Sequence, residues 1–149
     1  NLEMREIMKK LIIGLTIMLT FASTSATAGE EEDIQKAVVA AEAWLTLVDQ
    51  GKFAESWDQA ASTMQNGIGK PKWVQAVGNV RTPIGALRSR ILMKDVDAPK
   101  MAKLPAGDAV IIQFTSAFER LAPAIETVTP FRETDGSWKV SGYYIKPAK

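Results

Sequence analysis

Two arginines and one glutamate are the charged residues whose positions favour a role in binding. Arg81 follows an apolar helical segment, Arg90 lies mid-strand, and Glu126 lies near the start of a later strand. The guanidinium fork of an arginine fits a carboxylate, so either arginine could hold an acidic ligand or pair internally with the glutamate. We expect Arg90 and Glu126 to approach within ion-pair distance, with both interpretations left open.

Aromatic residues form a second candidate site. Each of three predicted helices carries one tryptophan, at Trp44, Trp57 and Trp73. Together with Phe114 and Tyr144 they could line an apolar cavity between helices and sheet, or they could fill that space as core. The candidate ligand-binding residues are therefore Trp44, Trp57, Trp73, Arg81, Arg90, Glu126 and Tyr144.

The composition argues against most kinds of catalysis. The sequence has no histidine and no cysteine, which removes the commonest general base, the commonest metal ligand and any disulfide. A pocket enzyme of the ketosteroid isomerase or dehydratase type would need Asp58 or Glu126 as base and Tyr143 or Tyr144 as donor. Asp58 follows Trp57 and should face solvent if that tryptophan is buried. We expect no cofactor, no metal and a non-catalytic role, with the pocket enzyme as the alternative.

The charge and the first thirty residues bear on partners and location. Lys and Arg number 18 against 17 Asp and Glu, so no net field favours nucleic acid or an anionic membrane. Basic residues, an apolar run over 11–22 and a small-residue stretch ending at Ala28 are typical of a secretory signal peptide. We predict cleavage after Ala28, a single domain over 29–149, and a periplasmic or secreted protein that is not a lipoprotein.

Hydrophobic periodicity predicts helices first and strands afterwards. Apolar residues recur at helical spacing over 33–50, 52–66 and from Pro71 to a break at Thr82-Pro83. Period-two alternation follows over 86–94 and 109–119, with 97–107 expected to be a loop. Segregated elements of this kind predict an α+β domain with three N-terminal helices packed on one face of a four-stranded antiparallel sheet.

A β-hairpin over 124–146 ends the chain. Asp135-Gly136 is a strong tight-turn signal, because glycine takes positive φ without steric cost. Strict alternation after the turn would place Trp138, Val140, Gly142 and Tyr144 on one face, and Lys139, Ser141, Tyr143 and Ile145 on the other.

Several stretches resemble a known family. The segment from Ala43 to Trp57 is similar to the opening of nuclear transport factor 2-like domains. Arg81–Gly85, Arg90, Glu126–Val128 and Gly136–Tyr143 resemble the bacterial domain of unknown function 4019 family. The resemblance implies a cone-like fold, in which a curved four-stranded sheet wraps around a long helix, and it implies no established activity. It also suggests a homodimer through the sheet face, to which the sequence would contribute Arg88, Gln113, Thr115, Lys139, Ser141 and Tyr143. The leading hypothesis is an exported small-ligand-binding or protein-interaction module.

Overall fold

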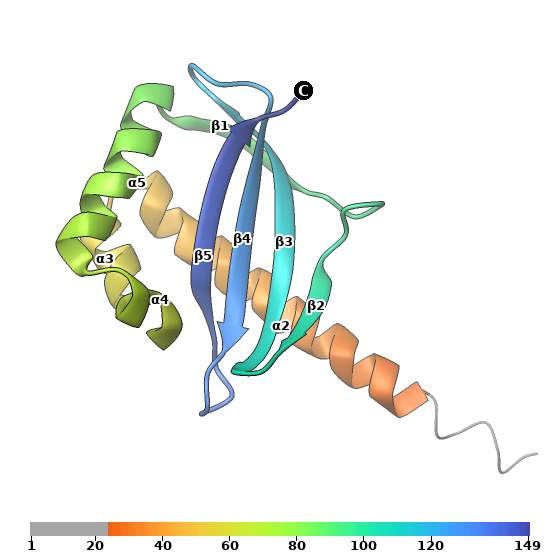
Figure 1. The fold of residues 1–149 in the computed structure, drawn as a ribbon. Coiled ribbons are helices and arrows are strands. Elements are labelled where there is room, and N and C mark those ends of the chain that lie inside the picture. Colours follow the sequence, from red (N-terminus) through yellow and green to blue (C-terminus); the bar gives the residue numbers. More distant parts are fainter. Residues whose placement is uncertain (1–23) are drawn as a thin grey trace, which may run out of the picture. The chain divides into compact units, whose positions relative to one another are not determined.

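The computed structural model describes residues 24–149, with side chains from Ala28 onward. Four helices come first in this part of the chain: α2 (Thr24–Asp49), α3 (Phe53–Asp58), α4 (Ser62–Gly67) and α5 (Lys70–Ile84). Five strands follow: β1 (Leu87–Leu92), β2 (Lys100–Leu104), β3 (Gly107–Phe118), β4 (Ala124–Arg132) and β5 (Trp138–Pro147). The predicted α+β class is confirmed (Figure 1). The predicted signal peptide lies almost entirely outside the described residues.

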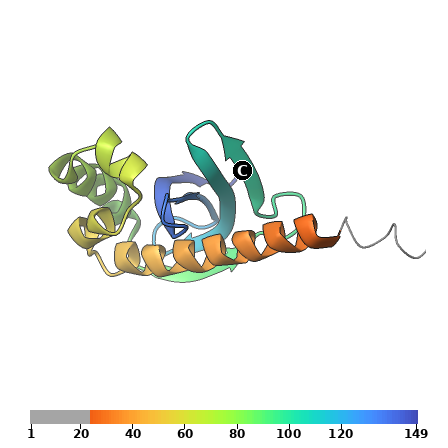
Figure 2. The same ribbon diagram turned by 90° about the horizontal axis from the view of Figure 1, so that it is seen from below.

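The strands form one antiparallel sheet. β1, β3, β4 and β5 lie side by side in this order, and β2 also pairs with β3. Among the described strands β5 pairs only with β4, so it is an edge strand. From Ile34 onward α2 runs along one face of this sheet (Figure 2). Its apolar residues Ala41, Leu45 and Val48 are buried in the same core as Ile112 and Phe114 of β3. We call this covered side the inner face.

The first two helices differ from those predicted. The first begins at Thr24 and not at Asp33, because the alanines and glutamates before Asp33 are good helix formers. The second, expected over 52–66, is interrupted between α3 and α4. There the backbone amide of Ala61 donates to the carbonyl of Val140 (2.8 Å), and Glu133 accepts from the amide of Ser62 (2.6 Å). The sheet therefore ends one helix and begins the next.

The last helix continues through the predicted break at Thr82-Pro83. A proline in the last turn forgoes one hydrogen bond, yet the helix continues to Ile84 and is followed by Gly85, whose φ is 80°. Arg120, in the β3–β4 connection, donates to the carbonyls of Pro83 (2.6 Å) and Thr82 (3.2 Å), which have no partner within the helix at its C-terminal end.

The sheet has a fifth strand where the sequence analysis expected only loop. β2 pairs with β3 from Lys100 opposite Ile111 to Leu104 opposite Gly107. A tight turn joins the two strands, and Gly107 has a φ of 142° and lies against the ring of Phe131. The predicted count of four strands is therefore wrong.

The terminal hairpin is present, but its faces are not those predicted. Pro130 pairs with Val140 and Thr129 with Gly142, so Ser141 is an extra residue that forms a β-bulge. Pro130 has no amide hydrogen to donate at this point, and the Ser141 hydroxyl donates to the carbonyl of Thr129 (2.8 Å). The bulge reverses the alternation, so Tyr143 joins Trp138 and Val140 on the inner face while Tyr144 is 61% exposed on the outer face.

Candidate functional site

A cluster of polar side chains lies between the helices and the inner face of the sheet. Each of six elements contributes one residue, and together we call them the inner polar cluster: Asp49 (end of α2), Arg81 (α5), Arg90 (β1), Ser116 (β3), Glu126 (β4) and Tyr143 (β5). Glu126 is fully buried and Arg81 is 5% exposed. Groups buried to this degree must satisfy one another, because water does not reach them.

Arg90 is held by two carboxylates. Its Nη1 and Nη2 donate to the two oxygens of Asp49 (2.6 and 2.9 Å), and its Nε and Nη2 donate to the two oxygens of Glu126 (2.7 and 3.1 Å). The expected contact between Arg90 and Glu126 is thus confirmed. Burial alone would lower the pKa of Arg90, but the hydrogen bonds to both carboxylates outweigh it and raise that pKa.

Arg81 lies near the same two carboxylates. Its Nη2 donates to Asp49 (2.9 Å), its Nη1 lies 3.4 Å from the hydroxyl of Tyr143, and its guanidinium stacks over the ring of Phe118 at 4.7 Å. Its Nε is buried without a partner among the described residues. Packing on an aromatic ring stabilises a cation that does not use all its donors.

Glu126 has no oxygen left for chemistry. Beyond Arg90, it accepts hydrogen bonds from the hydroxyls of Ser116 and Tyr143, the latter at 2.7 Å. Burial, followed by the negative charge of Glu126, raises the pKa of Tyr143, so this hydroxyl stays protonated and donates. A carboxylate with both oxygens engaged in this way is poorly placed to accept a proton from a substrate.

The charges of the inner polar cluster cancel. Two arginines face two carboxylates, and both carboxylates are already shared between the guanidinium groups. An acidic ligand entering here would bring a third negative charge into a buried site and would have to displace existing bonds. The geometry is that of an internal ion-pair network, which with its hydrogen bonds joins α2 and α5 to four strands of the sheet.

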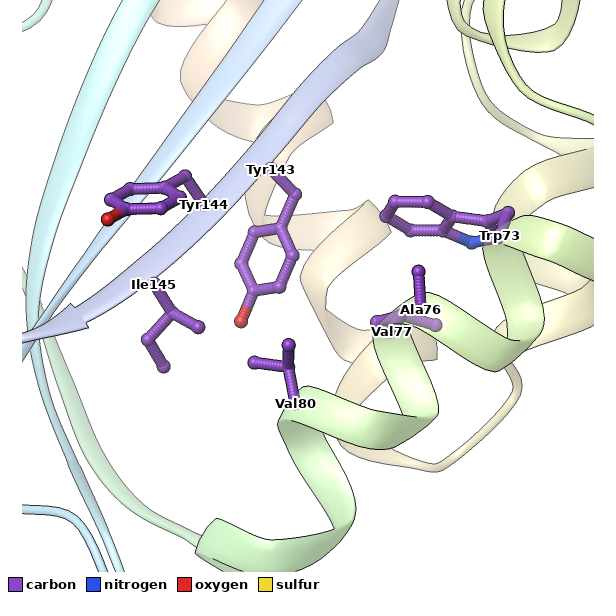
Figure 3. Close-up of a pocket in the computed structure, with 7 residues that line it drawn as sticks. All are labelled: Trp73, Ala76, Val77, Val80, Tyr143, Tyr144 and Ile145. Carbon is purple, nitrogen blue, oxygen red and sulfur yellow. The ribbon is translucent and has the colours of Figure 1, made fainter.

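A pocket lies beside this network, between α5 and the end of β5. We call it the α5–β5 pocket; its volume is about 170 Å³, and its lining is Trp73, Ala76, Val77, Val80, Tyr143, Tyr144 and Ile145. Figure 3 shows these side chains surrounding a mostly apolar space, with the ring of Tyr143 as its central wall. Tyr143 therefore belongs both to the pocket and to the inner polar cluster.

The structure separates the four aromatic candidates. Trp73 and Tyr144 line the α5–β5 pocket, whereas Trp44 lies behind it as core, 5.8 Å from the ring of Trp73 and 5.6 Å from that of Tyr143. Trp57 is half-buried elsewhere and donates to the carbonyl of Ile68 (2.8 Å), so it braces the connection between α4 and α5. Its neighbour Asp58 is exposed and pairs with Lys70.

Sequence reasoning missed two members of the inner polar cluster, Asp49 and Ser116, and considered Tyr143 only as a donor for an enzyme or as part of the dimer face. One signal was available for Asp49. A carboxylate in the last turn of a helix is unfavourable next to the negative end of the helix dipole, so it needs a compensating cation. Nothing in the local sequence distinguishes Ser116 from its neighbours on β3.

The described residues offer neither a membrane-spanning helix nor a metal site. No helix within 24–149 is long and apolar enough to cross a bilayer. No three acidic side chains in that range come together as ligands for an ion.

Fold and site together define a small α+β domain with a neutral ion-pair network and an apolar pocket at one sheet edge. A family model described as "Protein of unknown function (DUF4019)" matches residues 40–143. The chain belongs to this family. Comparison with the curated proteins found no match, and comparison with the solved structures found none either.

Proposed function

We propose that this protein is an exported, non-catalytic binding module that takes up a small apolar group in the α5–β5 pocket. The observation that carries the proposal is the lining of that pocket. Trp73, Tyr143 and Tyr144 provide aromatic surface, and Val77, Val80 and Ile145 provide aliphatic surface. Apolar pockets near 150 Å³ accept molecules about the size of benzene. The group could be a free small molecule or an apolar side chain of another protein.

A pocket enzyme with a carboxylate base is the weaker alternative. Glu126 accepts hydrogen bonds on both oxygens and does not line the pocket. Asp58 is exposed and is paired with Lys70 at 2.6 Å. Neither carboxylate faces the apolar space in which a substrate would sit, so we propose binding without turnover.

Export, the cone-like fold and a homodimer are further parts of the proposal. Removal of residues up to Ala28 would leave Gly29 at the start of the mature chain, and Glu30, Glu31 and Glu32 would then fall in the first turn of α2, where acidic residues are favourable. The sheet lying against α2 is compatible with the cone of nuclear transport factor 2-like domains. The outer face of the sheet exposes Ile91 and Ile111 as well as Tyr144, which suits association of two copies.

Benzene is a suitable first probe of the pocket. We expect titration with benzene to shift the methyl resonances of Val77, Val80 and Ile145 in a carbon–proton correlation spectrum. Ala76→Phe should abolish these shifts, because residue 76 is exposed at the pocket and a phenyl ring there would fill it. Gln75→Phe is the matched control on the same helix, since Gln75 is exposed and does not line the pocket.

The benzene titration has one outcome that supports binding in the pocket and one that contradicts it. Saturable shifts in the parent protein and in Gln75→Phe, but not in Ala76→Phe, would support the proposal. Unchanged methyl resonances at saturating benzene in a folded parent protein would contradict it.

A further inference from the structure

The α5–β5 pocket lies on an edge of the sheet and not on one of its faces. Three consecutive residues of β5, Tyr143, Tyr144 and Ile145, all line it. Consecutive side chains of a strand point to opposite faces, so one face alone cannot present all three. A cavity that touches all three must straddle the strand at its free edge, the edge that is turned away from β4.

Backbone groups at this edge are free to bind. The amide of Ala148 donates to the carbonyl of Pro123 (3.0 Å), and these two residues are opposite each other in the continued register of β4 and β5. This bond shows which residues of β5 direct their backbone groups toward β4. By alternation, Gly142, Tyr144 and Lys146 bond to β4, while the N–H and C=O groups of Tyr143 and Ile145 point outward. No backbone or side-chain hydrogen bond reaches these outward groups from any other part of residues 24–149.

Only the second half of the edge is open. Near the beginning of β5, the carbonyl of Val140 accepts from the amide of Ala61, and α4 lies beside the strand (Figure 1). After the bulge at Ser141 the cover by α4 ends, and the stretch without it is the part of β5 that faces α5 across the pocket. An unpaired strand edge next to an apolar pocket has the two features that strand-adding peptides use: main-chain bonds for affinity and a side-chain pocket for specificity.

The charged residues on α5 and β5 indicate the kind of partner that could bind at this edge. Neither α5 nor β5 contains an aspartate or glutamate, whereas Lys72 on α5 and Lys146 in the open half of β5 are exposed. A second copy would bring the same lysines to the shared edge and be repelled, because like charges directly opposite destabilise a strand pair. Acidic residues flanking the added strand would be attracted instead.

We propose that β5 receives an extended segment of another protein as an added strand along Tyr143–Pro147. One large apolar side chain of this segment enters the α5–β5 pocket, and acidic residues flank it. This inference rests on the proposed function, since it names the occupant of the same pocket. It adds a requirement that a free small molecule does not have, namely backbone bonding to Tyr143 and Ile145.

An array of labelled heptapeptides tests the inference by fluorescence anisotropy on protein purified after export with its own leader. The central residue is tryptophan, phenylalanine, leucine or alanine, and the flanks carry either glutamates or lysines. We expect glutamate-flanked peptides with an apolar centre to bind, with about tenfold loss for central alanine. The preference for glutamate over lysine flanks should shrink as salt is added. Ala76→Phe should abolish binding, and Gln75→Phe should not.

Single N-methylation along the best peptide then separates strand addition from capture of a side chain alone. Alternate amides of an added strand point toward β5, so methylation should weaken binding by about tenfold at every second position and have little effect between them. Equal tolerance at all positions would overturn strand addition. Failure of the whole array while benzene still occupies the pocket would also overturn it and leave the proposed function standing. Failure of both probes would remove the proposed function as well.

Discussion

At the scale of single residues, Tyr143 connects the two parts of the site. Its ring forms a wall of the α5–β5 pocket, and its hydroxyl donates to Glu126 at 2.7 Å. A ligand that moved the ring would therefore disturb the bond between Tyr143 and a fully buried carboxylate. Because such bonds are costly to lose, we infer that the inner polar cluster fixes the shape of the pocket and does not itself bind the ligand.

Glu126→Gln tests the structural role of the inner polar cluster. The substitution keeps the size of the side chain but leaves two buried arginines with Asp49 as the single remaining carboxylate of the cluster. Breaking a buried ion pair on one side typically costs about 3–5 kcal/mol, so the free energy of unfolding should fall by about that amount. Urea unfolding followed by tryptophan fluorescence measures it.

A surface ion pair provides the control for this measurement. Glu55→Gln removes the partner of Lys52 at 3.9 Å, where both side chains are about half exposed. Such pairs contribute less than about 1 kcal/mol, so this variant should unfold almost as the parent does. Equal effects of the two substitutions would show that the inner polar cluster is not an essential structural network.

At the scale of elements, β5 has two unlike halves. The first is covered by α4 and the second, after the bulge at Ser141, has an open edge. An open edge invites uncontrolled pairing, and proteins limit it with charges and proline. Lys146 and Pro147 occupy the end of β5, so this edge is protected against aggregation while Tyr143 and Ile145 stay accessible.

Amide hydrogen exchange should reveal this open edge directly. The amides of Tyr144 and Lys146 bond to β4, whereas those of Tyr143 and Ile145 face outward, so after correction for intrinsic rates the latter two should exchange about ten times faster or more. Nuclear magnetic resonance on the free protein measures all four rates.

The central strand β4 supplies the internal control. Glu126 and Thr127 each bond to one of the two neighbouring strands, so their amides should be similarly protected. Uniform protection along β5 would mean that its outward amides have partners, and the strand-addition proposal would then lose its basis.

Local patterns predicted the type of most elements, and long-range contacts decided the details. Asp135-Gly136 marked the hairpin turn, because that signal is complete within two residues, and Gly136 does take a φ of 85°. The bulge at Ser141 depends on Pro130 across the ladder, so alternation within β5 alone gave the wrong faces for Tyr143 and Tyr144. The short strand β2 is stabilised by its pairing with β3, and its own five residues carry no pattern that predicts a strand.

The candidate site was likewise predictable in part from local patterns, while the rest depended on tertiary packing. Arg90 and Glu126 could be paired in advance, since both are charged residues on strands of one predicted sheet. Asp49 joins them only because α2 ends over the inner face, which is a property of the tertiary packing. Trp73 and Tyr144 were among the residues predicted to line a cavity, and both do line the pocket. The place of the pocket at the strand edge, with Tyr143 as a further wall, could not be predicted, because the faces of β5 were misassigned.

At the scale of the whole molecule, the outer face of the sheet bears on the proposed dimer. Tyr143, expected there, lies on the inner face, and its place is taken by Tyr144 at 61% exposure, together with Ile91 at 66% and Ile111 at 45%. The register places Gln113, Thr127 and Tyr144 in one row across β3, β4 and β5, and it places Thr115 between Ile91 and Ile125. Apolar residues set among small polar ones form a surface that can pack against its own copy without being insoluble alone.

Native mass spectrometry of protein exported with its own leader tests export and association together. We expect a protomer mass matching Gly29–Lys149 and a dimer that Ile91→Glu converts to a monomer, because the new charges would lie in the contact between copies. Val39→Glu is the matched control, since Val39 is 65% exposed on α2, away from the sheet's outer face. A full-length mass in the exported fraction would contradict cleavage after Ala28. A parent protein that is monomeric at high micromolar concentration would contradict the sheet-face dimer, and the outer face would then be ordinary surface.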